Sequence, residues 1–163
     1  MKKLLLILLC LPLMTLAQQT YVPDDNFEAY LEANGMGNGI ANDDLVLTAN
    51  INAVTYLSVG SSNNISDLTG IEDFIALTHL YCSFNQLTSL DLSNNTQLVI
   101  LECTENFQLT TLDVSQNTAL HGLYLWNNQL TSLDVSNNIL LNELDCGDNQ
   151  LTTLDVSNKI VFD

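Results

Sequence analysis

From Val54 onward, apolar and polar residues recur in a fixed phase. The pattern Leu-x-x-Leu-x-Leu-x-x-Asn occupies Leu87–Asn95 and returns at Leu98–Asn106, with Cys103 at its third apolar place. Two such half-units of 10 or 11 residues make one unit of 21 or 22 residues, and an upstream, divergent copy begins at Val54. Roughly five coils fit between Val54 and Asp163, so the pattern predicts a repeat solenoid.

The apolar pairs within each unit predict short strands that stack on one another. In Leu-x-Leu the two apolar side chains lie on one face of a strand and the middle residue lies on the other. One such strand cannot bury its face alone, so successive coils are expected to stack as a parallel sheet with strands ~4.8 Å apart. The best-aligned strands place these leucines in register: Leu80, Leu101, Leu123 and Leu144.

Two columns of asparagine accompany the apolar positions. The first consists of Asn85, Asn106, Asn128 and Asn149. The second consists of Asn95, Asn117 and Asn138, and it ends where Lys159 takes the next place. The asparagines of the first column follow the point where the strand must turn inward. A buried amide there can hydrogen-bond backbone groups of neighbouring coils that the turn leaves unpaired.

In these residues the chain resembles bacterial, secreted leucine-rich repeat proteins of the internalin-like kind. The resemblance covers Val54 to Asn158, and Tyr21–Asn52 is similar to the N-terminal cap that precedes such repeats in exported proteins of bacteria related to flavobacteria. It implies a leucine-rich repeat solenoid of stacked parallel β-strands with short loops and a small N-terminal helical cap. It also implies a binding surface without catalysis.

Residues 1–17 are predicted to be a secretory signal peptide. Met1-Lys2-Lys3 is basic, Leu4–Leu16 is apolar, and a small residue stands three places and one place before a cleavage site at Gln18. The apolar run has about 13 residues, whereas a spanning helix needs about 20. We therefore expect a secreted or cell-surface protein whose mature chain does not insert into a membrane.

The mature chain is expected to contain a cap over residues 18–52 and a solenoid over 53–163. The cap helix is predicted to start at Asp25, with Glu28 completing a capping box, and to stop at Asn34-Gly35. Phe27, Tyr30 and Leu31 form its apolar stripe. No closing cap is recognisable before Asp163, which favours a truncated solenoid.

The charge balance excludes two classes of partner. The chain has 19 acidic residues, three lysines and no arginine, for a net charge of −16. Without Lys2 and Lys3 only Lys159 remains, and the charge becomes −18. Nucleic acids and anionic lipid surfaces both require clustered basic side chains, so neither is an expected partner. The sequence gives no prediction of oligomeric state.

The residues that could perform chemistry favour structural roles. Cys82, Cys103 and Cys146 occupy inward positions, which predicts buried free thiols; a Cys82–Cys103 disulfide and a zinc site are the less favoured alternatives. His79 and His121 have no serine or cysteine partner at a recognisable spacing. We therefore expect no enzyme activity and no cofactor.

An outward column of aspartates requires compensation. Asp91, Asp113, Asp134 and Asp155 are expected to lie ~5 Å apart, where like charges repel. Nearby hydroxyls are the expected donors: Ser93, Thr88, Thr111, Thr131, Ser136 and Thr152. A row of calcium ions is the alternative. The Gly/Asn/Asp loop over residues 34–44 has Met36 and Leu45 where a calcium loop needs carboxylates, so we interpret it as a plain turn.

The variable outward positions of the strands are the candidate binding surface. The core does not require aromatic residues there, and aromatics rimmed by acids are typical of recognition patches. The candidate residues are Tyr81, Phe84, Tyr124, Trp126, His79 and Glu102. The predicted function is therefore an exported, non-enzymatic module that binds a protein or a glycan. A structural or surface-layer scaffold tied by calcium is the alternative.

Overall fold

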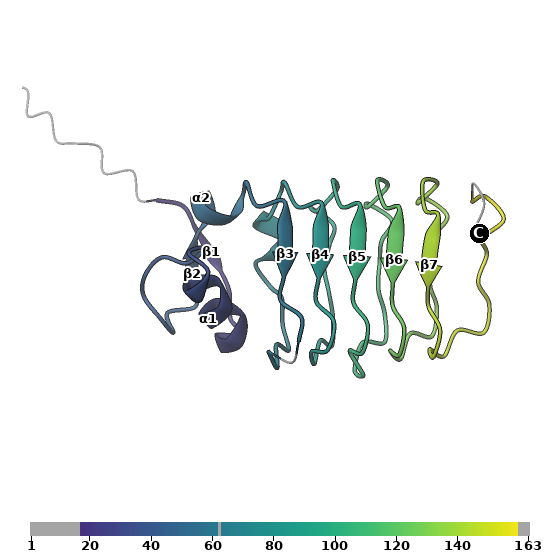
Figure 1. The fold of residues 1–163 in the computed structure, drawn as a ribbon, viewed down its shortest axis with the longest axis horizontal. Helices are drawn as coiled ribbons and strands as arrows, with labels where there is room; N and C mark the ends of the chain where they lie inside the picture. The colour runs from purple at the N-terminus through teal and green to yellow at the C-terminus, as the bar shows by residue number, and fades with distance from the viewer. Residues whose placement is uncertain (1–16, 62, 160–163) are drawn as a thin grey trace, which may run out of the picture.

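The computed structural model describes residues 17–61 and 63–159. They form an elongated solenoid with a small cap at its N-terminal end (Figure 1). All but the last residue of the predicted signal peptide, and the tail over residues 160–163, lie outside the described residues. In the part that is described, no helix has the length and apolar character needed to cross a membrane.

One strand from each coil enters a five-stranded parallel sheet. The strands are β3 (Tyr56–Ser58), β4 (His79–Tyr81), β5 (Ile100–Glu102), β6 (Gly122–Tyr124) and β7 (Glu143–Asp145), and they pair in chain order. The register aligns Leu57, Leu80, Leu101, Leu123 and Leu144. This confirms the predicted solenoid of stacked parallel strands.

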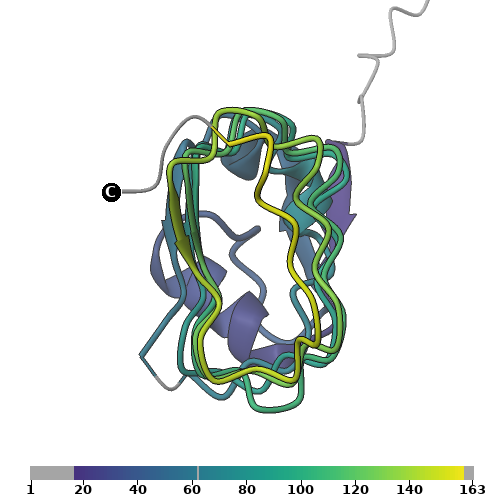
Figure 2. The same cartoon turned by 90° about the vertical axis from the view of Figure 1, so that its right-hand side faces the viewer.

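Each coil has two long walls, which are opposite one another when the solenoid is seen along its axis (Figure 2). The strand wall carries β3–β7. The back wall carries the second half-unit, over residues 88–93, 110–115, 131–136 and 152–157. Both halves have the same apolar spacing, yet only the strand wall contains a hydrogen-bonded sheet. On the back wall, aspartate side chains accept the backbone N–H groups locally, for example Ser93 N–H to Asp91 at 2.9 Å.

The core is a stack of leucines that closes against the cap. Leu80, Leu101 and Leu123 are fully buried, and each contributes about 2 kcal/mol by leaving water. At the cap end Phe27 stacks on Phe74, with ring centroids 6.4 Å apart. The apolar stripe of the cap helix therefore covers the open end of the first coil, as a solenoid terminus requires.

The first asparagine column links consecutive coils through both ends of each amide. Asn106 Oδ1 accepts the Leu87 N–H at 3.1 Å, and its Nδ2 donates to the Cys82 carbonyl at 3.2 Å. The oxygens of Asn85, Asn128 and Asn149 are occupied in the same way. The predicted coil-to-coil role is confirmed.

The second column uses only the nitrogen end. Asn117 Nδ2 donates to the carbonyls of Leu92 and Asn95 at 2.9 and 3.0 Å, and Asn138 repeats the arrangement one coil later. The Oδ1 atoms of Asn95, Asn117 and Asn138 are buried and have no hydrogen-bond partner among the residues that the structure describes. At the next place the Lys159 ammonium donates to the Val135 carbonyl, so lysine takes over the donor role of the amide.

The cap contains more structure than the predicted helix and loop. Helix α1 (Asp25–Ala33) ends at Asn34 as expected, but its N-cap is Asp24 rather than Asp25. An antiparallel pair, β1 (Gln19–Tyr21) with β2 (Leu45–Leu47), and the short helix α2 (Thr48–Ile51) complete it. A 3-10 turn, η1 (Ile71–Asp73), follows in the first coil.

Asp24 also attaches the cap to the solenoid. One carboxylate oxygen accepts the N–H groups of Asn26 and Phe27, and the other accepts the N–H and hydroxyl of Ser66 at 2.8 Å each. Burial opposes ionisation of Asp24, yet these donors, Ser66 foremost, hold its pKa below the usual value. A charged Asp24 therefore joins the helix start to the first coil, which explains why capping falls on this residue.

Candidate binding face

The outward side chains of β3–β7 form two parallel rows, which together we call the strand face. The first row is Tyr56, His79, Ile100, Gly122 and Glu143. The second row is Ser58, Tyr81, Glu102, Tyr124 and Asp145. The register thus brings four of the predicted binding residues, His79, Tyr81, Glu102 and Tyr124, onto one surface.

An aromatic group occupies the end of the strand face nearest the cap. The Tyr56 ring lies 5.2 Å from the Tyr81 ring and 6.2 Å from the His79 ring, measured between centroids. Tyr56 is 59% exposed, more than any other aromatic side chain here. Tyr56 was not among the predicted binding residues because it lies in the divergent first coil. Tyr56 could have been found because it precedes the inward Leu57 just as His79 precedes Leu80.

Glu102 stands at the centre of the strand face. Its Oε1 accepts the Ser83 hydroxyl at 3.2 Å, and the Ser83 oxygen accepts the Thr104 N–H at 3.0 Å. Ser83 itself is buried, with 4% of its surface exposed. Partial burial, together with the neighbouring Tyr56 and Glu102, raises the pKa of Tyr81.

Tyr124 is positioned by an acid and a glycine. Its hydroxyl donates a hydrogen bond to Glu143 on the next strand. That bond, with partial burial and the Glu143 charge, raises the pKa of Tyr124 to about 12. The ring lies over Gly122, where a Cβ would come within 3.1 Å of Tyr124 Cε2 and 2.7 Å of Ile100 Cδ1. Glycine at this place therefore makes room for the ring.

Trp126 uses a second glycine in the same way. It follows β6 and is 37% exposed. A Cβ at Gly147, at the equivalent place of the next coil, would lie 3.0 Å from Trp126 Cδ1. The indole therefore leans on the backbone of the neighbouring coil. Two glycines in otherwise regular coils coincide with the two aromatic residues, which indicates a shaped surface rather than scattered side chains.

Phe84 lies at the turn beside the strand face. It is 49% exposed and has φ +58°, the left-handed conformation. Glu105, Asn127 and Asp148 occupy the same place in later coils, also with positive φ. Asparagine and aspartate tolerate this conformation best, whereas a bulky aromatic is strained there. Phe84 is therefore less suited to this turn than the asparagine and aspartate at the same place in later coils.

The strand face is acidic toward its C-terminal end. Glu143, Asp145 and Asp148 are all exposed there. Lys159 is the one lysine or arginine of residues 17–159, and it is bonded to the Val135 carbonyl and the Asn158 side chain. Carboxylates on the strand face therefore have no lysine or arginine partner among the residues that the structure places.

The aspartates of the back wall are bonded to their own coils. Each accepts the N–H of the serine two residues on, at 2.8–2.9 Å, as Asp113 does from Ser115. These backbone bonds, with the serine hydroxyls, lower the pKa of all four carboxyls. Of the predicted hydroxyl donors to the aspartates, Ser93 and Ser136 are correct. The main donor is the backbone N–H of each serine, and the predicted threonines are not the partners.

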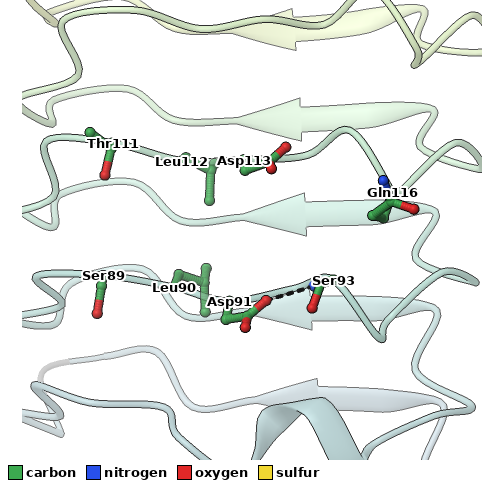
Figure 3. Close-up of a pocket in the computed structure, with 8 residues that line it drawn as sticks. All are labelled: Ser89, Leu90, Asp91, Ser93, Thr111, Leu112, Asp113 and Gln116. Atoms are coloured by element: carbon green, nitrogen blue, oxygen red, sulfur yellow. Dashed lines mark hydrogen bonds between the residues drawn. The ribbon is translucent and has the colours of Figure 1, made fainter.

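Shallow grooves separate successive coils on the back wall. One, with a volume of about 280 Å³, lies between Ser89-Leu90-Asp91 and Thr111-Leu112-Asp113 (Figure 3). Its polar groups repeat from coil to coil with little variation.

At the cap, the carboxylates of Asp25, Glu28 and Asp44 approach within 4.8 Å of one another, and Glu28 already accepts the N–H groups of Asp43 and Asp44. Asp25, Glu28 and Asp44 are thus close enough to one another to hold a cation.

The thiols and histidines are arranged as side chains of the fold. Cys82, Cys103 and Cys146 are free; the first two are buried and Cys146 is half-buried. Contact with the Cys103 thiol and burial raise the pKa of Cys82 well above its usual value, which disfavours the reactive thiolate. His121 bonds to the Ala119 carbonyl, and His79 bonds to the Thr78 hydroxyl.

Comparison with known proteins gives one sequence relative and several related folds. No family model matches the chain. Internalin J of Listeria monocytogenes is 41% identical over 76 residues, which is 47% of this chain and 8% of the relative. The crystal structure of the internalin InlF from the same species has a TM-score of 0.68 at 22% identity, and the match covers 85% of this chain and 40% of that chain.

A third comparison is with a functional domain of InlJ from Listeria monocytogenes, described as including a cysteine ladder. It is 27% identical, with a TM-score of 0.42, over 90% of this chain and 46% of that chain. The chain thus spans less than half the length of each of these proteins. The repeat phase, the parallel sheet and the InlF fold agree, so this chain folds as a leucine-rich repeat solenoid similar to that of InlF.

Proposed function

We propose that the protein is an exported, non-enzymatic binding module that recognises a partner protein through its strand face. A glycan is the alternative ligand. The predicted signal peptide would deliver the module to the cell surface or the surrounding medium. Tyr81, Tyr124 and Trp126 are the proposed central anchors, with Tyr56, His79 and Phe84 beside them.

One observation carries this proposal. Outward residues of the back wall repeat almost unchanged from coil to coil, whereas those of the strand face differ in every coil. The inward leucines and asparagines hold both walls together, so the fold does not require this variation. Tyr124 is half-buried and Trp126 is exposed, and each is seated over a glycine. Tyr and Trp are the residue types enriched among the anchors of protein interfaces.

The calcium-tied scaffold is less well supported. In each back-wall aspartate one carboxylate oxygen already accepts a backbone N–H, and this bond stabilises the charge without a metal ion. The coils are also linked by the two asparagine columns, so calcium is not needed to join them.

The test is a binding screen with matched variants. The full chain, secreted and purified, would be applied to an array of bacterial and host surface proteins and to a glycan array. One variant removes the anchors (Tyr81→Ala, Tyr124→Ala, Trp126→Ala). The control variant changes three back-wall residues (Ser89→Ala, Thr111→Ala, Thr131→Ala), all exposed.

We expect the anchor variant to lose its array signals and the back-wall variant to keep them, while both retain the wild-type unfolding temperature within a few degrees. Signals that survive in the anchor variant and disappear in the back-wall variant would contradict the proposal. Binding to the protein array would identify a protein ligand, and binding to the glycan array would identify a glycan ligand.

A further inference from the structure

The strand face combines rings and carboxylates in a specific order. Tyr81, Glu102 and Tyr124 occupy the same row on three consecutive strands. Strands of a sheet are ~4.8 Å apart, so the backbones of Tyr81 and Tyr124 lie ~5 Å on either side of that of Glu102. A cation is attracted to an aromatic ring within about 6 Å of the ring centroid.

We propose that the strand face binds a cationic side chain, an arginine or lysine of a partner protein, above Glu102 and between Tyr81 and Tyr124. This inference rests on the proposed function and specifies the chemistry of the ligand. The carboxylate supplies the ion pair, and the two rings supply flanking cation–π contacts.

The groups around this position are already fixed by their neighbours. Ser83 donates to Glu102 Oε1, which orients the carboxylate and leaves Oε2 for a ligand. Tyr124 is held by Glu143 and Gly122, and Tyr81 by its contact with Tyr56. Side chains that are oriented before binding lose less conformational entropy when a ligand arrives.

The charge of the chain selects the sign of the ligand. Residues 18–163 carry 19 acids and one lysine, and within the described ranges 17–61 and 63–159 no lysine or arginine competes for Glu102. An anionic ligand would be repelled, whereas a basic one would be attracted along its approach. Arginine fits better than lysine because its planar guanidinium can pair with a carboxylate while stacking on an aromatic ring.

Further carboxylates lie two coils along the strand face and add to its negative charge. Glu143 and Asp145 are exposed neighbours on β7, about 10 Å along the sheet from Glu102 by the strand spacing. The partner is therefore expected to present two basic side chains about 10 Å apart. An extended segment with arginines three residues apart has that spacing, at ~3.3–3.6 Å per residue.

The probe is the peptide acetyl-Arg-Gly-Gly-Arg-amide, compared with its citrulline counterpart, which has nearly the same shape and no charge. Both are titrated into the ¹⁵N-labelled full chain, and amide shifts give the site and the dissociation constant. Glu102→Gln is the test variant. Asp134→Asn on the back wall is the matched control, because it removes the same charge and an asparagine oxygen can still accept the Ser136 N–H.

We expect the arginine peptide to shift amides of β4, β5 and β6 and the citrulline peptide to leave them unchanged. Glu102→Gln should weaken the arginine peptide about fivefold, the loss of one exposed ion pair in an aromatic setting, and Asp134→Asn less than twofold. Tyr81→Leu, which keeps apolar bulk but removes the ring, should weaken it two- to threefold.

Equal effects of Glu102→Gln and Asp134→Asn, equal binding of the two peptides, or no shifts on the strand face at millimolar peptide would each overturn the inference. The proposed function is judged separately. If array ligands depend on Tyr81, Tyr124 and Trp126 but not on Glu102, the binding module stands and the cation site is wrong. If the anchor variant keeps every ligand, the proposed function itself is wrong.

Discussion

The two walls of the solenoid are built on the same apolar spacing but present different surfaces to solvent. The back wall repeats Asp and Ser in each of its coils, and each aspartate is bonded to its own coil. The strand wall presents tyrosine, glutamate, tyrosine and aspartate in one row. Where the repeat is constant the residues serve the fold. Where it varies, the leucine and asparagine columns already provide the stability, and the surface is free to specialise.

The asparagines at the ends of the two half-units differ as well. On the strand side both the oxygen and the nitrogen of Asn106 are bonded, whereas on the back side the oxygen of Asn117 is buried without a partner. The strand half is therefore fixed more tightly to the neighbouring coil. A surface used for recognition gains from this rigidity, because ordered side chains bind at a smaller entropic cost.

The largest predicted effect tests this difference between the asparagines. Asn106→Ala leaves the buried Leu87 N–H without its acceptor and removes the amide bonds to the Cys82 and Thr104 carbonyls. It is expected to lower the free energy of unfolding by about 3 kcal/mol. Asn117→Ala loses only donor bonds and should cost about 2 kcal/mol. Urea unfolding of both variants measures the two values. A larger loss for Asn117→Ala would reverse the comparison.

A second prediction concerns the acid that holds Tyr124. Absorbance titration of the phenols should resolve one tyrosine that ionises at pH about 12. Glu143→Gln removes the carboxylate and should return that pKa toward the ordinary value near 10. Since the folded pKa is raised, the stabilisation from this contact is present below pH 10 and lost as pH rises toward 12. An unchanged titration in Glu143→Gln would show that Tyr124 is not fixed by this acid.

Phe84 offers a direct contrast between stability and binding. Phe84→Asn places a residue that tolerates positive φ at this turn, and it should raise the free energy of unfolding by about 0.5–1 kcal/mol. The same change removes an exposed ring beside the strand face and should weaken partner binding. Phe84→Ala is the control, because it removes the ring without favouring the left-handed conformation. If Phe84→Asn raises the free energy of unfolding no more than Phe84→Ala does, backbone strain at Phe84 is not the cause of the change.

The smallest expected effect is on the back wall. Millimolar calcium should leave the unfolding temperature of the chain unchanged, because each aspartate is already compensated by a backbone N–H. Asp113→Asn should behave like the wild type in the same experiment. A calcium-dependent rise in the unfolding temperature that Asp113→Asn reduces would instead favour the scaffold.

The regular part of the molecule could be predicted from the sequence because its spacing carries the information. The phase of the repeat specified the register of Leu80 with Leu101 and the burial of Asn106. It also identified Tyr81 and Tyr124 as outward residues of one row. These properties follow from periodicity alone, without reference to any individual contact.

The rest depends on contacts that periodicity does not encode. Tyr56 lies in a coil whose pattern had diverged, and Ser83 is buried by its bonds to Glu102 and Thr104 rather than by its place in the repeat. The role of Gly122 appears only when the Tyr124 ring is placed over it. Asp24 was missed as a cap because its second oxygen bonds to Ser66, a residue 42 positions away.

The most direct test of the account is an amide chemical-shift map of the ¹⁵N-labelled chain bound to its strongest ligand from the arrays. If the strand face binds the ligand, we expect shifts over β4 to β7 and the turns that follow them, including Phe84 and Trp126, with the back wall unchanged. Shifts confined to the back wall, around Asp91 and Asp113, would contradict it and assign recognition to the constant surface instead.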